Sequence, residues 1–272
     1  MKTEDCCELR FNLDERNFSH VLSAVTLSAL AARTSSVQSP HTSCIWIGGR
    51  FVMRTNLTER SLFEGADRFL CSMRWVDGLG AAEQGTFTAG CEIGCNPFIS
   101  LAQSGPETSP AKTFSGQVTP ASVLQDQQGL LARPNSSNSW LGQMATGVRS
   151  WGYDCRVRSH AYDQGFSSDA EGSGKQDPVY PAVELLSIAA LAFFADVRGW
   201  QPDARTIRYF VWNQSVSFDV VPYAVAHRMN GVEGRSYVAS DRGAAYGKGA
   251  AYKFFPESEE DKGVLTRASR RT

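Results

Sequence analysis

Two apolar segments, residues 18–32 and 181–195, constrain the fold more than any other feature of this sequence. Each is shorter than the roughly 20 apolar residues that a helix needs to cross a bilayer, and His20 and Glu184 interrupt them. Apart from Glu184 and Ser187, the second segment has no polar face, which is the pattern of a helix buried on all sides. The sequence therefore predicts two helices inside a hydrophobic core and no membrane-spanning segment.

A strand, a hairpin and a second helix are predicted around the first apolar segment. Residues 8–13 have the pattern of a strand, and residues 59–71 have that of an amphipathic helix. Between them, two apolar runs within residues 44–53 flank Gly48-Gly49, the kind of dipeptide that a tight hairpin requires. The N-terminal part is therefore expected to follow a β-α-β-β-α order.

A similar order is predicted after the second apolar segment. Residues 207–212 and 216–218 have the pattern of two strands joined by a short turn, and a helix is expected to start near Asp219. Leu22 and Leu186 differ by 164 positions, as do Trp46 and Phe210. The pattern predicts an α+β fold of two related helix–β-hairpin–helix halves joined by a polar, loop-rich centre, although two such units can also resemble each other by chance.

Polar segments separate and follow these halves. Residues 103–143 are rich in Ser, Pro, Gln and Asn, residues 163–177 are polar, and residues 231–249 are rich in Gly, so all three are expected to form loops. The predicted units are an N-terminal α+β half at 1–102, a loop-rich centre at 103–178, a C-terminal α+β half at 179–256 and a charged tail at 257–272.

Composition excludes several classes of protein. A chain that is 42% hydrophobic and 20% charged, with a net charge of −1, is neither disordered nor a highly basic nucleic-acid coat. Its seven cysteines are an odd number, which argues against a disulfide framework. Residues 1–7 carry acids where a secretory signal carries basic residues. We therefore expect a cytoplasmic protein, with most cysteines acting as small core residues.

No standard catalytic or cofactor-binding motif is present. Residues 172–175 (Gly-Ser-Gly-Lys) lack the upstream glycine and the following Ser or Thr of a phosphate-binding loop. Residues 246–252 have two of the three glycines of a dinucleotide fingerprint. Cys91 and Cys95 form one close pair, where zinc sites usually show two. We therefore expect no cofactor, no metal ion and no enzymatic activity.

Cations, glycines and tyrosines are interleaved in residues 226–253. Five cations stand against two acids in this segment, and arginine outnumbers lysine in the whole chain. Such a segment suits contact with a phosphate backbone or stacking on bases. On this ground Arg242, Lys248 and Lys253 are candidate nucleic-acid-binding residues, with a solvated Gly-rich loop as the alternative.

Three segments taken together resemble a known protein family. They are residues 112–117 (Lys-Thr-Phe-Ser-Gly-Gln), residues 154–169 (Asp-Cys-Arg-Val-Arg, then Asp-Gln-Gly-Phe-Ser-Ser-Asp) and residues 180–187 (Tyr-Pro-Ala-Val-Glu-Leu-Leu-Ser). In this order they resemble the small CRISPR-associated family of type I-U (I-G) loci, a candidate large-subunit counterpart in the Cascade effector complex. The resemblance spans about residues 17–255. It departs after Glu184, where this chain lacks the Gly-Leu-x-x-Phe-Arg-Pro pattern toward which the family tends.

The resemblance implies a non-catalytic subunit of a type I CRISPR RNA-guided surveillance complex in antiviral defence. Its partners would be the other effector subunits, guide RNA and target DNA, with no membrane. Lys112, Arg156 and Arg158 lie in the matching motifs and would neutralise phosphates as nucleic-acid-binding residues. The acids nearby would hold these arginines or cap helices; they are Asp154, Asp163 and Glu184.

Two other interpretations remain open. The arginines could pair with neighbouring acids and fix the central fold, while nucleic acid is held only by partner subunits; the net charge of −1 favours weak binding by the chain alone. The Arg/Asp cluster could instead be the site of a small-molecule enzyme or ligand-binding protein, which needs a concave pocket with pKa-shifted groups. Burial of Arg156 in a closed pocket would favour the enzyme, and its exposure along a groove would favour the subunit.

Overall fold

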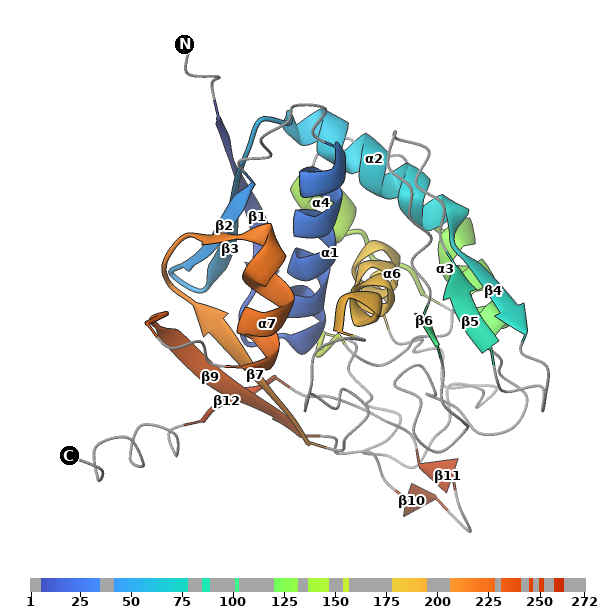
Figure 1. The fold of residues 1–272 in the computed structure, drawn as a ribbon. Coiled ribbons are helices and arrows are strands. Elements are labelled where there is room, and N and C mark those ends of the chain that lie inside the picture. The colour runs from blue at the N-terminus through green and yellow to red at the C-terminus, as the bar shows by residue number, and fades with distance from the viewer. Residues whose placement is uncertain are drawn as a thin grey trace.

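Two helices lie side by side at the centre of the computed structural model, α1 (Phe18–Thr34) and α6 (Pro181–Ala190) (Figure 1). The structure describes residues 6–34, 42–77, 85–88, 101–102, 120–131, 137–146, 154–156, 178–194, 206–227, 231–240, 245–246, 250–251 and 257–261. Every residue of α6 is buried, as its lack of a polar face predicts. The predicted α+β class is confirmed. None of the described helices combines the length and the apolar character that a membrane span requires.

An antiparallel sheet packs on one side of α1. Its strands, in the order β1-β3-β2-β8, are β1 (Cys7–Asp14), β3 (Arg50–Thr55), β2 (Ser43–Ile47) and β8 (Val216–Ser217). The predicted hairpin is confirmed: Gly48 and Gly49 turn the chain at φ values of 57° and 82°, which favour glycine. Phe11 and Phe51 point into the core, with their ring centroids 5.6 Å apart.

The amphipathic helix α2 (Glu59–Ser72) crosses the top of the molecule as drawn in Figure 1. It begins where the sequence predicts, because the Thr58 hydroxyl accepts a hydrogen bond from the Ser61 N–H and caps the first turn. Its buried face includes Leu62, Phe63 and Phe69. This face covers the end of the core that the central helices leave open.

The second predicted hairpin, formed by residues 207–212 and 216–218, is wrong. The strands exist as β7 (Thr206–Trp212) and β8, but β7 pairs with β9 (Gly234–Ser240), whereas β8 adds to the edge of β2. Seven paired positions join β7 to β9, and the Trp212 indole N–H donates to the Cys44 carbonyl oxygen at 2.8 Å. This long pairing, made with a strand beyond the next helix, replaces the short local one.

Glycine makes the β7–β9 pairing possible. A Cβ atom on Gly234 would lie 2.1 Å from the Val211 carbonyl oxygen, so only glycine fits at the start of β9. On its other edge, β9 pairs with β12 (Glu259–Glu260). The Gly-rich segment 231–249, predicted as a loop, therefore contains a strand. Between β8 and β9 the chain forms a 3₁₀ turn, η2 (Phe218–Val220), and α7 (Val221–Ala226), close to the helix predicted near Asp219.

The polar centre also contains helices that its composition did not predict. These are α3 (Pro120–Gly129) and α4 (Ser137–Leu141), both within residues 103–143. Val123 and Leu124 of α3 and Trp140 of α4 are buried, and the Trp140 ring packs edge-on against Phe63 at 5.2 Å. A few well-spaced apolar side chains are enough to anchor a helix, even where the average composition is polar.

The remaining elements are short. They are η1 (Leu191–Phe194), which continues α6; β4 (Arg74–Asp77), β5 (Gly85–Thr88) and β6 (Leu101–Ala102), which form one sheet; and the pair β10 (Ala245–Tyr246) and β11 (Ala250–Ala251). Residues 163–177 lie outside the described residues. Of the described cysteines only Cys44 is buried, and Cys6 and Cys71 are exposed, so the expectation of mostly core cysteines is wrong for these positions.

Candidate functional site

Asp154 is fully buried where the first turns of α1 and α6 meet. The Asn17 side chain links it to α1, because its oxygen accepts from the Ser19 N–H at 3.1 Å while its Nδ2 donates to Asp154 Oδ1 at 2.7 Å. On the other side, the Asp154 N–H donates to Glu184 Oε1 of α6 at 3.3 Å. The Asn17 amide and the Glu184 carboxylate thus join the buried Asp154 to both helices.

Arg156 folds back onto this carboxylate. Its Nη2 and Nε donate to Asp154 Oδ2 at 2.6 and 3.1 Å, and its backbone N–H donates to Oδ1 at 3.0 Å. The guanidinium also stacks on Tyr180, 3.5 Å from the ring centroid. The side chain keeps 27% of its surface exposed, and its Nη1 makes no hydrogen bond to a described residue. Among the described residues, Arg156 is therefore a partly exposed cation fixed by Asp154 and Tyr180, with one donor edge that none of them occupies.

The electrostatics of the cluster fix its charge states. Burial alone would raise the pKa of Asp154, but the hydrogen bond from Arg156 and the charges of His20 and Arg156 outweigh it and hold this pKa below its usual value. Burial lowers the pKa of His20 to about 4, against the opposing charge of Asp154. At neutral pH Asp154 is ionised and His20 is neutral.

This arrangement positions a cation and is poorly suited to proton transfer. The Asp154 carboxylate already accepts from Asn17 and Arg156, so it is not a free base. His20 accepts the Asp14 N–H through Nδ1 at 2.8 Å, and its Nε2 is buried without a partner among the described residues. A general base needs hydrogen-bond reach to its substrate, which enclosure denies to His20.

Most of the predicted site lies outside the described residues. This holds for Lys112, Arg158, Arg242, Lys248 and Lys253, so Arg156 is the one predicted nucleic-acid-binding residue among the described residues. Asp163 and the cysteine pair at 91 and 95 are also outside. Among the residues that are described, no group of three or more His, Cys, Asp or Glu side chains could hold a metal ion.

One cation of the basic segment 226–253 has a structural partner. Arg235 on β9 pairs with the buried Glu15, with Nη2 2.6 Å from Oε1. The Tyr237 hydroxyl donates to the same carboxylate at 2.7 Å, and the Tyr209 hydroxyl donates to the Glu15 carbonyl at 3.0 Å. This network ties β9 to the N-terminal half, so Arg235 contributes less to any basic surface than its sequence position suggests.

Sequence reasoning missed a second cationic group, on the outer face of the N-terminal sheet. An open pocket of about 360 Å³ lies there, and its lining residues are Arg10, Phe11, Asn12, Ile47, Arg50, Val52 and Asn138. Alternation along β1 was the available signal, because Glu8, Arg10 and Asn12 occupy every second position and are all exposed.

Comparisons with known proteins add no relative to this description. No family model matches the chain, no curated protein matches it, and no solved structure matches its fold.

Proposed function

We propose that this chain is a non-catalytic subunit of a type I CRISPR RNA-guided surveillance complex, which contacts guide RNA or target DNA together with other effector subunits. The observation that carries the proposal is a contact between two of the segments on which the resemblance rests. Arg156 stacks on Tyr180, and the Asp154 N–H donates to Glu184 Oε1, although these pairs are separated by 24 and 30 positions in the chain. Two motifs that are distant in the sequence therefore form one contiguous cluster of side chains.

The Asp154–Arg156 cluster is better suited to directional hydrogen bonds than to long-range electrostatic attraction. Asp154 neutralises much of the charge of Arg156, so the pair adds little to long-range attraction of phosphates. The Nη1 edge, which makes no hydrogen bond to a described residue, still offers fixed donors that suit one phosphate or carbonyl oxygen. Most of the phosphate neutralisation would then come from Lys112, Arg158, Arg242, Lys248 and Lys253, or from partner subunits.

Co-purification tests the proposal. The tagged chain is expressed with the effector proteins encoded beside its gene and with a guide RNA, and the RNA-containing complex is isolated by size exclusion. We expect the chain to elute with this complex. Elution of the chain alone at low salt, with no guide RNA or DNA retained, would overturn the proposal and direct attention to the small-ligand alternative.

A matched pair of double variants tests the contribution of the cluster. Arg156→Ala/Arg158→Ala is expected to weaken co-elution. Arg60→Ala/Arg68→Ala removes the same charge from exposed positions of α2 and is expected to leave co-elution unchanged. Melting temperatures of both variants, measured on the isolated chain, separate loss of binding from loss of folding.

We also infer that the two halves are related, as the repeated spacing in the sequence predicts. Ser23 and Ser187 differ by 164 positions, and each hydroxyl lies within hydrogen-bond distance of the same two carbonyl oxygens, those of Ser19 and Val183. Ser19 and Val183 also differ by 164 positions. This exchange of partners is what a local two-fold axis between equivalent helices would produce.

A further inference from the structure

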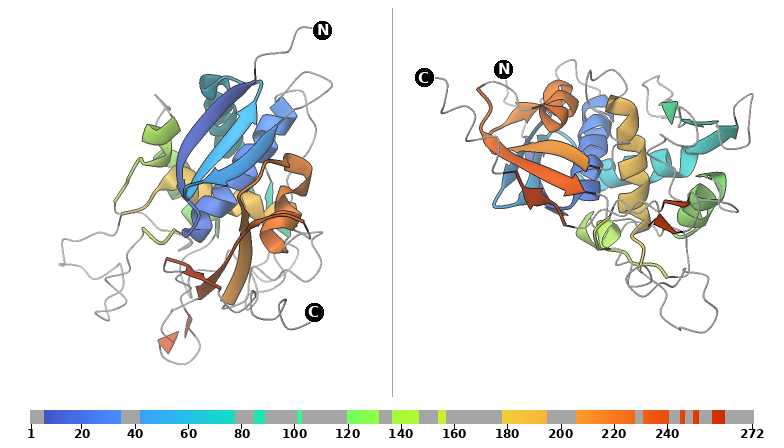
Figure 2. Two further views of the ribbon diagram at one scale, coloured as in Figure 1. Left: turned by 90° about the vertical axis from the view of Figure 1, so that its left-hand side faces the viewer. Right: turned by 90° about the horizontal axis from the view of Figure 1, so that it is seen from below.

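The outer face of the N-terminal sheet is open to solvent on the side turned toward the viewer in the left panel of Figure 2, where the strands lie in front of α1. Alternation places nine side chains on it: Glu8, Arg10 and Asn12 of β1, Arg50, Val52 and Arg54 of β3, and Ser43, Ile45 and Ile47 of β2. At its rim, Asn138 of α4 accepts the Asn12 N–H at 2.8 Å. We call this surface the β1–β3–β2 face.

Cations outnumber acids on this face. Glu8 serves two arginines, with Oε1 2.9 Å from Arg10 Nη2 and Oε2 3.4 Å from Arg54 Nε. Arg50 makes no ion pair with any described residue. The acid opposite it in register, Asp14, uses its carboxylate to accept the Arg16 N–H at 2.9 Å. A chain with a net charge of −1 thus gathers three arginines on this face, against Glu8 between two of them and Asp14 opposite the third.

The pocket on this face has the size and lining for one nucleotide unit. Its volume of about 360 Å³ lies at the lower end of the range for small-ligand pockets. The Phe11 side chain points into the core, so the apolar part of the lining comes from Val52, which is nearly buried, and from Ile47, which keeps 45% of its surface exposed. Arg10 and Arg50 supply charge. The apolar side chains offer a contact for the face of a base, while guanidinium groups bind the adjoining phosphates.

We propose that the β1–β3–β2 face binds a short segment of single-stranded nucleic acid, with one nucleotide in the pocket and its neighbouring phosphates on Arg10, Arg50 and Arg54. A duplex keeps its bases stacked and paired, so it cannot offer a single unit to the pocket. The choice of nucleic acid as the partner rests on the proposed function. The site itself is separate from the Asp154–Arg156 cluster.

The binding expected of such a face is weak, tolerant of sequence and sensitive to salt. Each phosphate neutralised on a single strand contributes about −0.7 to the slope of log K against log salt concentration. Three arginines therefore predict a slope of about −2 for this face. Apolar contacts with a base would add little sequence preference, because every base presents a similar flat surface.

A variant that gains affinity gives the sharpest test. Glu8→Gln removes the shared acid and frees Arg10 and Arg54, so binding should tighten by about threefold or more at low salt. Glu64→Gln is the matched control, because it makes the same charge change and frees Arg60, whose Nε lies 2.7 Å from Glu64 Oε1 on α2. The probe is a fluorescently labelled single-stranded RNA of about 12 mixed nucleotides, followed by anisotropy with the full chain at about 50 mM salt.

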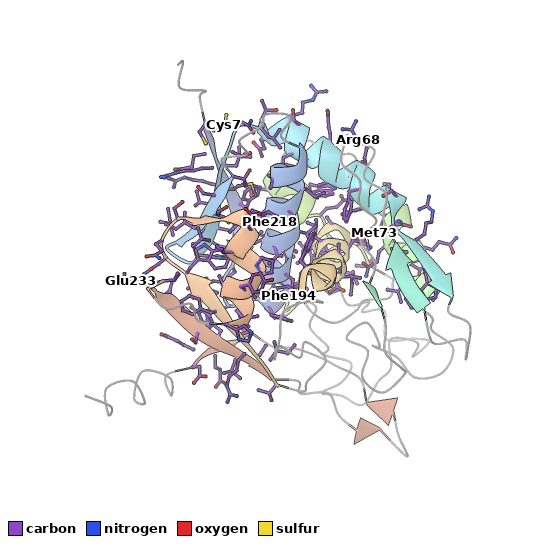
Figure 3. All side chains as sticks on the ribbon, in the orientation of Figure 1. Cys7, Arg68, Met73, Phe194, Phe218 and Glu233 are labelled. Atoms are coloured by element: carbon purple, nitrogen blue, oxygen red, sulfur yellow. The ribbon has the colours of Figure 1, made fainter. Side chains whose placement is uncertain are left out.

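Charge removal supplies the complementary arm. Arg10→Gln/Arg50→Gln/Arg54→Gln should weaken binding by about tenfold or more and make the salt slope shallower by about 2. The control Arg60→Gln/Arg68→Gln/Arg208→Gln changes the net charge equally at exposed positions of α2 and β7, and Figure 3 shows Arg68 on the outward side of α2. All six arginines are exposed, and melting temperatures check folding.

The outcomes separate this site from the proposed function. The site would be overturned if Glu8→Gln and Glu64→Gln had equal effects, or if the two triple variants did. It would also be overturned by tighter binding of the same sequence as a duplex, or by no binding at low salt. None of these results requires the chain to leave the RNA-guided complex. Conversely, oligonucleotide binding at this face together with failed co-elution would contradict the proposed role in the RNA-guided complex but would still support the nucleic-acid site on this face.

Discussion

The hydroxyl oxygens of Ser23 and Ser187 lie 3.4 Å apart where α1 packs against α6, and each reaches one carbonyl of its own helix and one of the other. A hydroxyl has one proton, so each serine donates to one of its two acceptors at a time. The small side chains allow the helices to approach closely, and the hydroxyls keep the contact satisfied inside an apolar core.

Ser23 and Ser187 should have similar energies. We expect Ser23→Ala to lower the free energy of unfolding by about 1 kcal/mol, since it removes one buried hydrogen bond and little volume. Ser187→Ala should cost somewhat more, because Ser187 Oγ also lies 2.5 Å from the buried Ser19 Oγ. The double variant should lose less than the sum, because the hydroxyls share acceptors. Urea unfolding of the four proteins measures this cycle. A difference of several kcal/mol between the single variants would contradict the local two-fold relationship.

His20 should make stability depend on pH. Its pKa is about 4 in the folded chain and 6.5 in the unfolded chain, so the unfolded state binds more protons between these values. Stability is therefore complete above pH 6.5 and falls as pH drops toward 4, by up to about 3 kcal/mol. We expect the melting temperature of His20→Gln to depend less on pH between 4 and 6.5 than that of the unmodified chain. An unchanged pH profile would show that His20 is not the group responsible.

Asp154 should be costly to neutralise. Asp154→Asn leaves Arg156 without its carboxylate and weakens the link between α1 and α6, so a loss of about 3 kcal/mol is expected. The lowered pKa of Asp154 places the corresponding acid-induced loss below the His20 window, because stability from a depressed carboxyl pKa disappears only as pH falls through that pKa. Denaturant unfolding at pH 7 measures the first effect, with the exposed Glu64→Gln as a control expected to change stability little.

Gly234 should tolerate no side chain. In Gly234→Ala the new methyl group meets the Val211 carbonyl oxygen, which belongs to the strand backbone and cannot move aside, so a loss of about 3 kcal/mol or more is expected. Gly231→Ala is the control. Its φ of 80° is strained for alanine, but nothing lies within 4 Å, so about 1 kcal/mol is expected. Thermal unfolding of both variants distinguishes a steric clash from backbone strain.

Local signals in the sequence predicted the elements that local physics determines. The hairpin at 44–53 follows from its Gly-Gly turn, and the buried helices follow from apolar runs without a polar face. The pairing of β7 with β9 was missed because it joins strands separated by a helix, and the alternative with β8 was nearer in sequence. Non-local pairing leaves little trace in one sequence.

At the candidate site, too, the sequence indicated local contacts and missed contacts between distant segments. That Asp154 holds Arg156 was one of the readings open from the sequence, because the residues are two positions apart. The contribution of Asn17 was not foreseen, since 137 positions separate it from Asp154. Ring stacking on Tyr180 likewise depends on how the first turn of α6 meets the chain at Arg156.

The burial of α1 against α6 has a consequence during synthesis. The ribosome completes α1 at Thr34 and must add about 150 further residues before α6 exists, which takes roughly 8–30 s at the usual 5–20 residues per second. For that time the nascent chain carries an apolar helix without its partner, and β2 has an open edge until β8 emerges. Fragments that stop before residue 181 should therefore engage chaperones or aggregate, whereas the full chain can bury the helix.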